Sequence, residues 1–156
     1  MQAIALDAPG GLVEIEAASW RDLNLVRELE RLCFPHDAWP LLDMLGVLTL
    51  PHVVRLKAVD GEQVVGFVAG DVRRLQNVAW IATICVHPDW QGRRIGAQLL
   101  EECEGQVGVR TVKLSVRASN EAALRLYRRM GYQQTGTWPR YYKGGEDAVV
   151  MEKILN

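Results

Sequence analysis

The residues best suited to chemistry are concentrated between positions 91 and 97. This segment holds Gln91, Gly92, Arg93, Arg94 and Gly96, and it joins an apolar run to an amphipathic one. It therefore reads as a loop between a buried strand and the start of a helix. Backbone N–H groups at a helix start, the helix dipole and arginine side chains all attract an anion. The segment predicts a site for a phosphate or pyrophosphate. A surface turn without a ligand is the alternative, because short glycine motifs are weak evidence.

A second pair of candidate residues, Asn120 and Tyr127, follows further along the chain. The two lie seven residues apart and so share one face of a helix. A tyrosine hydroxyl can donate a hydrogen bond or a proton at neutral pH. Each residue also has a purely structural interpretation, since Asn120 is a good helix cap and Tyr127 a common type of core residue.

The bulk composition is that of an ordinary globular protein, and we expect a single domain over residues 1–156. Hydrophobic residues make up 49% of the chain, charged residues 24%, and the net charge is -1. This balance argues against binding to nucleic acid or to an anionic membrane. No apolar run is long enough to span a bilayer. Residues 1–10 lack the basic start of a secretory signal, so we expect a cytoplasmic location.

The cysteines and histidines do not predict a metal site. Cys33, Cys85 and Cys103 lie far apart among apolar neighbours, which is typical of reduced thiols and not of a disulfide framework. The three histidines share no ligand spacing with these cysteines, so we expect no structural metal.

Hydrophobic periodicity and turn residues predict seven strands and four helices. Strands are expected over residues 12–17, 53–59, 64–73, 78–86, 111–116, 132–138 and 148–154. One helix is expected between a capping box at Ser19–Asp22 and Pro35, and others over residues 41–48, over 94–107 and from a cap at Ser119 or Asn120 to Met130.

Two burial patterns follow from the same periodicity. The first helix is expected to bury the stripe Leu25, Val26, Leu29, Leu32 and Cys33. The apolar strand 78–86 is expected to be buried on both faces. The element order β-α-α-β-β-β-α-β-α-β-β indicates an α+β fold around one mixed sheet.

The order of the elements and the two motifs resembles the GCN5-related N-acetyltransferase (GNAT) family over nearly the whole chain. This resemblance implies an acyl-CoA N-acyltransferase fold, with a mostly antiparallel seven-stranded sheet flanked by four helices. It also implies acetyl-CoA as the co-substrate and Tyr127 as the general acid toward the departing thiolate. The cofactor-binding residues implied are Ile84, Val86, Gln91, Gly92, Arg93, Arg94, Ile95, Gly96, Ala97 and Asn120.

The loop departs from the family pattern at Arg94, which occupies the place of a glycine. A positive φ angle at this position would strain an arginine. We expect a helical backbone instead, with Gly92 relieving the turn, so that Arg94 costs little and can bind phosphate.

The branch of the family that the chain resembles most is that of the bacterial ribosomal-protein alanine (RimI-like) N-acetyltransferases. The similarity lies in the run 116–120 with Tyr127, in the run 140–142 followed by 145–151, and in the run 33–40. It implies that Trp39, Tyr141 and Tyr142 contact the acceptor, although the two tyrosines can also be read as aromatics flanking a strand. The branch has a general-base glutamate where this chain has Ser115. Water, Glu14, Asp37 or Asp71 would have to replace it.

The most favoured activity is acetyl transfer from acetyl-CoA to the N-terminal α-amine of a protein or peptide, by direct attack. An N-acetyltransferase of small amines and an acyl-CoA-binding module with little catalysis are the alternatives. We expect neither nucleic acid nor membrane as a partner, and a monomer or weak homodimer.

Overall fold

The computed structural model describes residues 13–156. Leu12, expected to begin the first strand, and the segment 1–10 lie outside these residues. The strands are β1 (Val13–Ala17), β2 (Val53–Asp60), β3 (Gln63–Arg73), β4 (Val78–Val86), β5 (Thr111–Arg117), β6 (Gln133–Trp138) and β7 (Ala148–Ile154). The helices are α1 (Leu23–Cys33), α2 (Leu41–Thr49), α3 (Ile95–Val107) and α4 (Glu121–Arg129). The predicted order of elements and the α+β class are confirmed.

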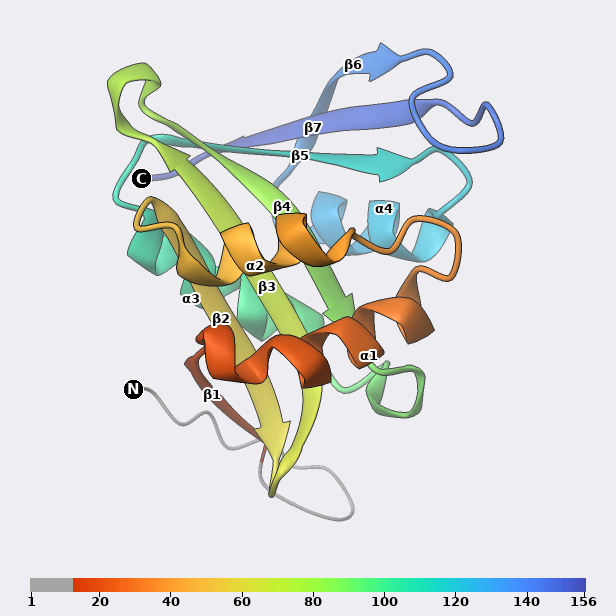
Figure 1. Ribbon diagram of the computed structural model, residues 1–156. Helices are drawn as coiled ribbons and strands as arrows, with labels where there is room; N and C mark the ends of the chain where they lie inside the picture. The colour runs from red at the N-terminus through yellow and green to blue at the C-terminus, as the bar shows by residue number, and fades with distance from the viewer. Residues whose placement is uncertain (1–12) are drawn as a thin grey trace.

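The strands form one sheet in the order β1-β2-β3-β4-β5-β7-β6. Every neighbouring pair is antiparallel except β4 and β5, which are parallel. These two strands pair only from Val78 with Thr111 to Trp80 with Lys113. Beyond that point β4 and β5 diverge, as Figure 1 shows. Within the part of the chain described, β4 therefore pairs with no strand on the β5 side over residues 81–86.

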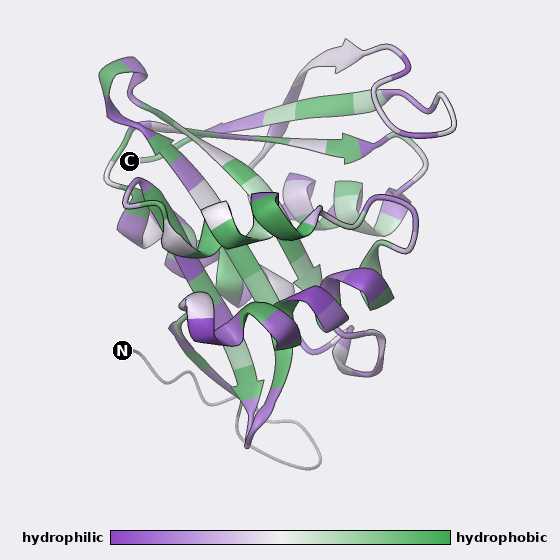
Figure 2. Cartoon of the chain, viewed as in Figure 1, coloured by the Kyte–Doolittle hydropathy of each residue, from purple (hydrophilic) through white to green (hydrophobic). Residues whose placement is uncertain are grey.

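Helices cover both faces of the sheet (Figure 1). One hydrophobic core packs the sheet against α3 and α4, and it includes Leu99, Leu100 and Leu124. The other packs the opposite face against α1 and α2, and it includes Val26 and Met44. Figure 2 shows largely hydrophobic central strands and a hydrophilic outer side of α1, the distribution expected for helices that bury one stripe.

The buried stripe of α1 differs from the one predicted. The capping box forms, with the Ser19 N–H donating to the Asp22 carboxylate, but it opens a short 3-10 turn before α1 begins. Leu25 and Leu32 are exposed, at 44% and 56% of their surface. The helix instead buries Val26, Leu29 and Glu30. Only one side of α1 meets the sheet, so residues beside the narrow stripe stay in solvent even when they are apolar.

The prediction that β4 is buried on both faces is also wrong. Buried and half-buried residues alternate along this strand. Ile84 and Val86 are only half-buried, because they line a cavity that the divergence of β4 from β5 leaves open.

The start of α3 is held close to the sheet by Gly66 on β3. A Cβ atom at this position would lie 2.8 Å from Cδ1 of Leu99 and 3.2 Å from Cγ2 of Ile95. Real Cβ atoms do not approach so closely, so only glycine permits this packing. Gly66 thereby fixes where the N-terminus of α3 lies relative to β4.

Candidate active site

Two cavities meet where β4 and β5 diverge. The first, the α3–α4 cavity, has a volume of about 850 Å³ and lies between the start of α3, the strand β4 and α4. The second, the loop cavity, has a volume of about 650 Å³ and lies between the α1–α2 loop, the strands β4 and β5, and the β6–β7 loop. The residues that line both cavities are Cys33, Phe34, Ile84, Asn120, Ala123 and Tyr127. A molecule in either cavity can therefore reach Tyr127.

The predicted anion loop forms one end of the α3–α4 cavity. Gln91, Gly92, Arg94, Ile95, Gly96 and Ala97 line it, as expected. Arg93 does not, and its guanidinium lies 5.8 Å from the centre of the Trp90 ring. The binding role implied for Arg93 remains a prediction.

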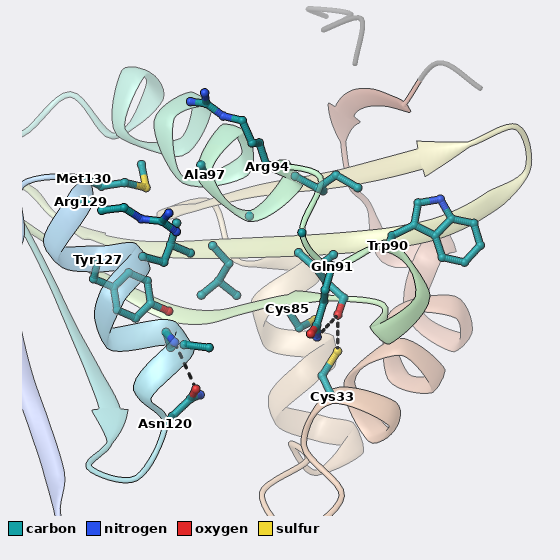
Figure 3. A pocket seen from close by; sticks show the side chains of 18 of the residues that line it. Cys33, Cys85, Trp90, Gln91, Arg94, Ala97, Asn120, Tyr127, Arg129 and Met130 are labelled. Carbon is teal, nitrogen blue, oxygen red and sulfur yellow. Dashed lines mark hydrogen bonds between the residues drawn. The ribbon is translucent and has the colours of Figure 1, made fainter. Parts of the chain in front are cut away.

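The expected helical backbone at Arg94 is wrong. This residue is the N-cap of α3, with φ 64° and ψ 13°, in the left-handed region that favours glycine. Gly92, at φ 80°, does not relieve the turn for it. A non-glycine residue in such a conformation costs about 1–3 kcal/mol. The Arg94 side chain lines the cavity next to the N-terminus of α3 (Figure 3).

Ile84 and Val86 form the floor of the α3–α4 cavity through β4. The Val86 carbonyl oxygen accepts two hydrogen bonds, one from Cys33 Sγ and one from Gln91 Nε2, both at 3.2 Å (Figure 3). The bond from Gln91 ties the loop to the strand, and the bond from Cys33 ties α1 to the same carbonyl.

The other end of the α3–α4 cavity carries residues that were not predicted. Arg129, Met130 and Lys153 line it, together with Glu101. Lys153 is paired with Glu104 at 2.8 Å. Arg129 and Arg94 both carry positive charge to this cavity (Figure 3). The arginines at the end of α4 could have indicated a second cationic end of the site. In the sequence, however, arginines there are equally well explained by the preference for cations at a helix C-terminus.

Asn120 and Tyr127 take the places that their spacing predicts. The Asn120 side chain accepts the Ala123 N–H at 3.2 Å, so it caps α4 while it also lines both cavities. Tyr127 is 6% exposed, and its hydroxyl points toward β4 (Figure 3). Burial raises the pKa of the Tyr127 phenol, so the hydroxyl keeps its proton at neutral pH and is available as a donor.

Aromatic side chains from two loops wall the loop cavity. Trp39 comes from the α1–α2 loop, and Tyr141 and Tyr142 from the loop between β6 and β7. The rings of the two tyrosines meet edge to face, 5.0 Å apart. The Tyr142 hydroxyl lies 3.2 Å from the Ser115 hydroxyl on β5. All three residues predicted to contact an acceptor thus line one cavity.

An ion-pair cluster centred on Arg117 joins the same two loops. Its guanidinium donates to both carboxylate oxygens of Asp37, at 2.6 and 2.8 Å, and to Glu146 at 2.8 Å. It also lies 4.9 Å from the centre of the Tyr142 ring. These contacts lower the pKa of Asp37, mainly through the hydrogen bonds from Arg117. The cluster therefore holds Asp37 as a carboxylate with both oxygens engaged by Arg117.

The predicted proton acceptors are not placed for that role. Asp37 is committed to Arg117, and neither Glu14 nor Asp71 lines either cavity. Asp71 pairs instead with His52 at 3.3 Å. Sequence reasoning missed the buried carboxyl of Glu30, which lies under the loop cavity. Glu30 follows Val26 and Leu29 at helical spacing, which could have placed it on the buried face of α1. The predicted stripe contained Leu25 and Leu32 instead, so it left Glu30 on the exposed side.

Comparison with known proteins agrees with this geometry. The model of the acetyltransferase (GNAT) family matches residues 15–132. The chain belongs to the GNAT acetyltransferase family. It is 37% identical over 146 residues to the N-alpha-acetyltransferase RimI of Mycobacterium tuberculosis, and the match covers 90% of this chain and 92% of that protein. The GNAT assignment makes the protein an acetyltransferase, and its fold is the one that the sequence resemblance implied.

Solved structures of other GNAT acetyltransferases have the same fold. The ribosomal-protein-S18-alanine N-acetyltransferase of Escherichia coli superposes with a TM-score of 0.84 at 25% identity, covering 93% of this chain and 95% of that one. Arabidopsis thaliana NAA60 in complex with acetyl-CoA superposes with a TM-score of 0.81 at 23% identity, covering 92% and 99% of the two chains.

Within residues 13–156, no group of three or more His, Cys, Asp or Glu side chains is arranged to hold a metal ion. In the same part of the chain, no helix is both long and apolar enough to cross a bilayer.

Proposed function

We propose that the protein transfers the acetyl group of acetyl-CoA to the α-amine at the N-terminus of a protein or peptide. The observation that carries this proposal is the meeting of the two cavities at Tyr127. One cavity fits the co-substrate and the other fits the acceptor, so the two reactants reach the same phenol from opposite sides.

The α3–α4 cavity suits the three parts of acetyl-CoA. Backbone N–H groups at the start of α3, with Arg94 beside them, suit the pyrophosphate. The free edge of β4 near Ile84 and Val86 suits the two amides of the pantetheine arm, which pair with a strand edge as a peptide does. The thioester end then lies near Tyr127. When bound there, acetyl-CoA supplies an activated acetyl group.

The chain itself has to supply a proton for the leaving thiolate. The acceptor nitrogen attacks the thioester carbonyl, a C–N bond forms and the C–S bond breaks. Tyr127 donates its proton to the sulfur as negative charge develops there, and it regains a proton from the acylated nitrogen through water. An α-amine has a pKa near 8, compared with about 10.4 for a lysine side chain, so it loses its proton more easily near neutral pH.

The charges of the loop cavity favour a protein N-terminus over a small polycation. Asp37 is the only carboxylate among the described residues that line it, and both of its oxygens already accept hydrogen bonds from Arg117. A polyamine or an aminoglycoside would find no free carboxylate there. The aromatic walls formed by Trp39, Tyr141 and Tyr142 suit the backbone and side chain of a terminal residue. The relatives named for acting on protein N-termini support the same choice.

The test is the release of CoA thiol from acetyl-CoA with two sets of acceptors. One set contains peptides that begin with Ala-Arg, Ser or Met, together with their N-acetylated forms as blocked controls. The other contains polyamines, aminoglycosides and free amino acids. Turnover of the unblocked peptides alone, at a rate that falls sharply in Tyr127→Phe, is the expected result. Turnover of small amines alone would overturn the proposal, and binding of acetyl-CoA without any turnover would favour a binding module.

The location and assembly expected from the sequence remain proposals. We propose a cytoplasmic protein, monomeric or weakly dimeric, that acts without nucleic acid or membrane. Cell fractionation and light scattering over a range of protein concentrations test these points.

A further inference from the structure

Glu30 is a buried acid that the reaction described above does not use. It lies on the inner face of α1 and is 1% exposed. Its Oε1 accepts the Trp39 backbone N–H at 2.6 Å, and its Oε2 accepts the Thr83 hydroxyl at 3.4 Å. Both partners, Trp39 and Thr83, line the loop cavity. The carboxyl therefore lies one side chain away from the place proposed for the acceptor amine.

No cation neutralises this carboxyl. Among residues 13–156, Glu30 takes part in none of the ion pairs formed by lysine, arginine or histidine. The Glu30 carboxylate in turn acts to raise the pKa of two thiols, Cys33 on its own helix and Cys85 on β4. Burial raises the pKa of Glu30 above its usual value. A buried acid without a charged partner is costly, and perturbed buried acids of this kind cluster at functional sites.

The structure also leaves a role in the reaction unfilled. A primary amine that becomes an amide must give up a proton, and an acceptor bound as an ammonium ion must give up a further one before it attacks. Ser115 stands where the RimI-like branch has its general-base glutamate, and its hydroxyl forms a hydrogen bond with that of Tyr142. Asp37 is held by Arg117. Glu30 accepts hydrogen bonds from two residues that line the loop cavity, and among residues 13–156 no guanidinium pairs with it.

We propose that Glu30 receives the proton of the acceptor ammonium through the Thr83 hydroxyl, and so keeps the bound amine in its attacking form. Thr83 passes its own proton to the carboxylate and takes one from the amine, directly or through a water molecule in the cavity. The neutral amine then attacks, and Glu30 later returns the proton to solvent. Glu30 touches neither reactant, so it is a positioning residue that acts through Thr83. This inference rests on the proposed function.

The alternative is that Glu30 only holds the α1–α2 loop through Trp39. The two roles separate in Glu30→Gln, because a glutamine oxygen can still accept the Trp39 N–H while its amide cannot take up a proton. Thr83 offers a matched pair, since Thr83→Ser keeps a hydroxyl and Thr83→Val keeps the shape without one. The measurement is kcat/KM for one peptide between pH 5 and 9, with saturating acetyl-CoA.

In the wild type, kcat/KM should fall at low pH because two groups must be deprotonated for the reaction, the α-amine of the acceptor and the carboxyl of Glu30. In Glu30→Gln and in Thr83→Val we expect the pH profile to show the ionisation of the acceptor amine alone. We also expect kcat/KM near pH 7 to fall at least tenfold, because general-base effects of this kind reach 10² to 10⁴. Thr83→Ser should keep both ionisations. Repeating the profile in a Cys33→Ser background assigns the second ionisation, because the thiol then no longer titrates.

The proposal is overturned if both variants keep the two-proton profile, or if Thr83→Val behaves as wild type. A loss of rate with an unchanged profile would mean that Glu30 only holds the loop. Should Glu30→Gln fail to fold, the serine and valine variants of Thr83 still decide between the two roles. A wild-type enzyme that turns over no peptide would contradict the proposed function instead, which separates the two failures.

Discussion

The hydroxyls of Ser115 and Tyr142 lie 3.2 Å apart and link β5 to the β6–β7 loop across the loop cavity. Ser115 stands where the RimI-like branch has a general-base glutamate. In this chain its hydroxyl positions Tyr142, which lines the loop cavity. If this bond orders the cavity, Ser115→Ala and Tyr142→Phe should each raise KM for the peptide and leave KM for acetyl-CoA unchanged.

The double variant of Ser115 and Tyr142 tests whether the two hydroxyls act as a pair. Each single change removes the same hydrogen bond, worth about 0.5–1.5 kcal/mol, so the double variant should be little worse than either single one. Steady-state kinetics of the four proteins measures this coupling. Strictly additive losses would show that the two side chains act separately.

Tyr127→Phe should lower kcat by about 10² to 10⁴ and leave the affinity for acetyl-CoA nearly unchanged. Tyr127 lines both cavities, and its ring packs in the core and stays in the variant. Rapid-mixing kinetics and calorimetry measure the two quantities.

Tyr132→Phe is the matched control for Tyr127. The Tyr132 ring meets that of Tyr127 edge to face, but its hydroxyl donates to Glu104 at 2.7 Å and lines neither cavity. This variant should keep its activity. Equal losses of rate in the two variants would indicate a packing effect and would remove Tyr127 from the mechanism.

Arg94→Gly should affect stability and binding in opposite directions. Glycine removes the strain of φ 64°, so the free energy of unfolding should rise by about 1 kcal/mol. Loss of the guanidinium should weaken acetyl-CoA binding about tenfold, the size of a hydrogen bond to a charged group. Urea denaturation and calorimetry give the two values.

Arg140→Gly provides the comparison for Arg94. Arg140 is also left-handed, at φ 53°, and it does not line the α3–α4 cavity. It should gain similar stability and bind acetyl-CoA as wild type does. Unchanged binding in Arg94→Gly would contradict a role for its side chain at the pyrophosphate.

The Glu146 carboxylate should contribute to stability in a pH-dependent way. Hydrogen bonds from Ser119, and then from Arg117, lower the pKa of Glu146 from 4.5 to about 2. The folded form therefore binds fewer protons than the unfolded form, so this contribution is full above about pH 4.5 and is lost as the pH falls toward 2. Glu146→Gln should be less stable than wild type at pH 7, and the difference should shrink below pH 4.5. Urea denaturation from pH 7 to pH 3 measures it, and a constant difference would contradict the ion pair.

Gly66→Ala should destabilise the fold by about 1–3 kcal/mol and weaken acetyl-CoA binding, because the new methyl group displaces Leu99 and Ile95 at the start of α3. Gly105→Ala is the control, since nothing lies within 4 Å of a Cβ there and alanine favours the helix. It should stabilise the protein by about 0.5–1 kcal/mol. Thermal unfolding with and without acetyl-CoA measures both, and equal effects of the two changes would contradict the close packing at Gly66.

The sequence alone determined the element order, the sheet class and the two motifs, because these features are local. Helical and strand periodicity, caps and turns act over a few residues, so α4 with Asn120 at its start and Tyr127 on one face could be read directly. The placement of Trp39, Tyr141 and Tyr142 in one cavity followed from the family resemblance and not from their spacing.

Only the tertiary structure decided which polar groups are committed and which are free. Asp37 and Arg117 lie 80 residues apart in the chain and pair only because the α1–α2 loop lies against the end of β5. The burial of Glu30 depends on which side of α1 faces the sheet. Contacts between residues far apart in the chain set each of these arrangements, and the pattern of neighbouring residues does not specify such contacts.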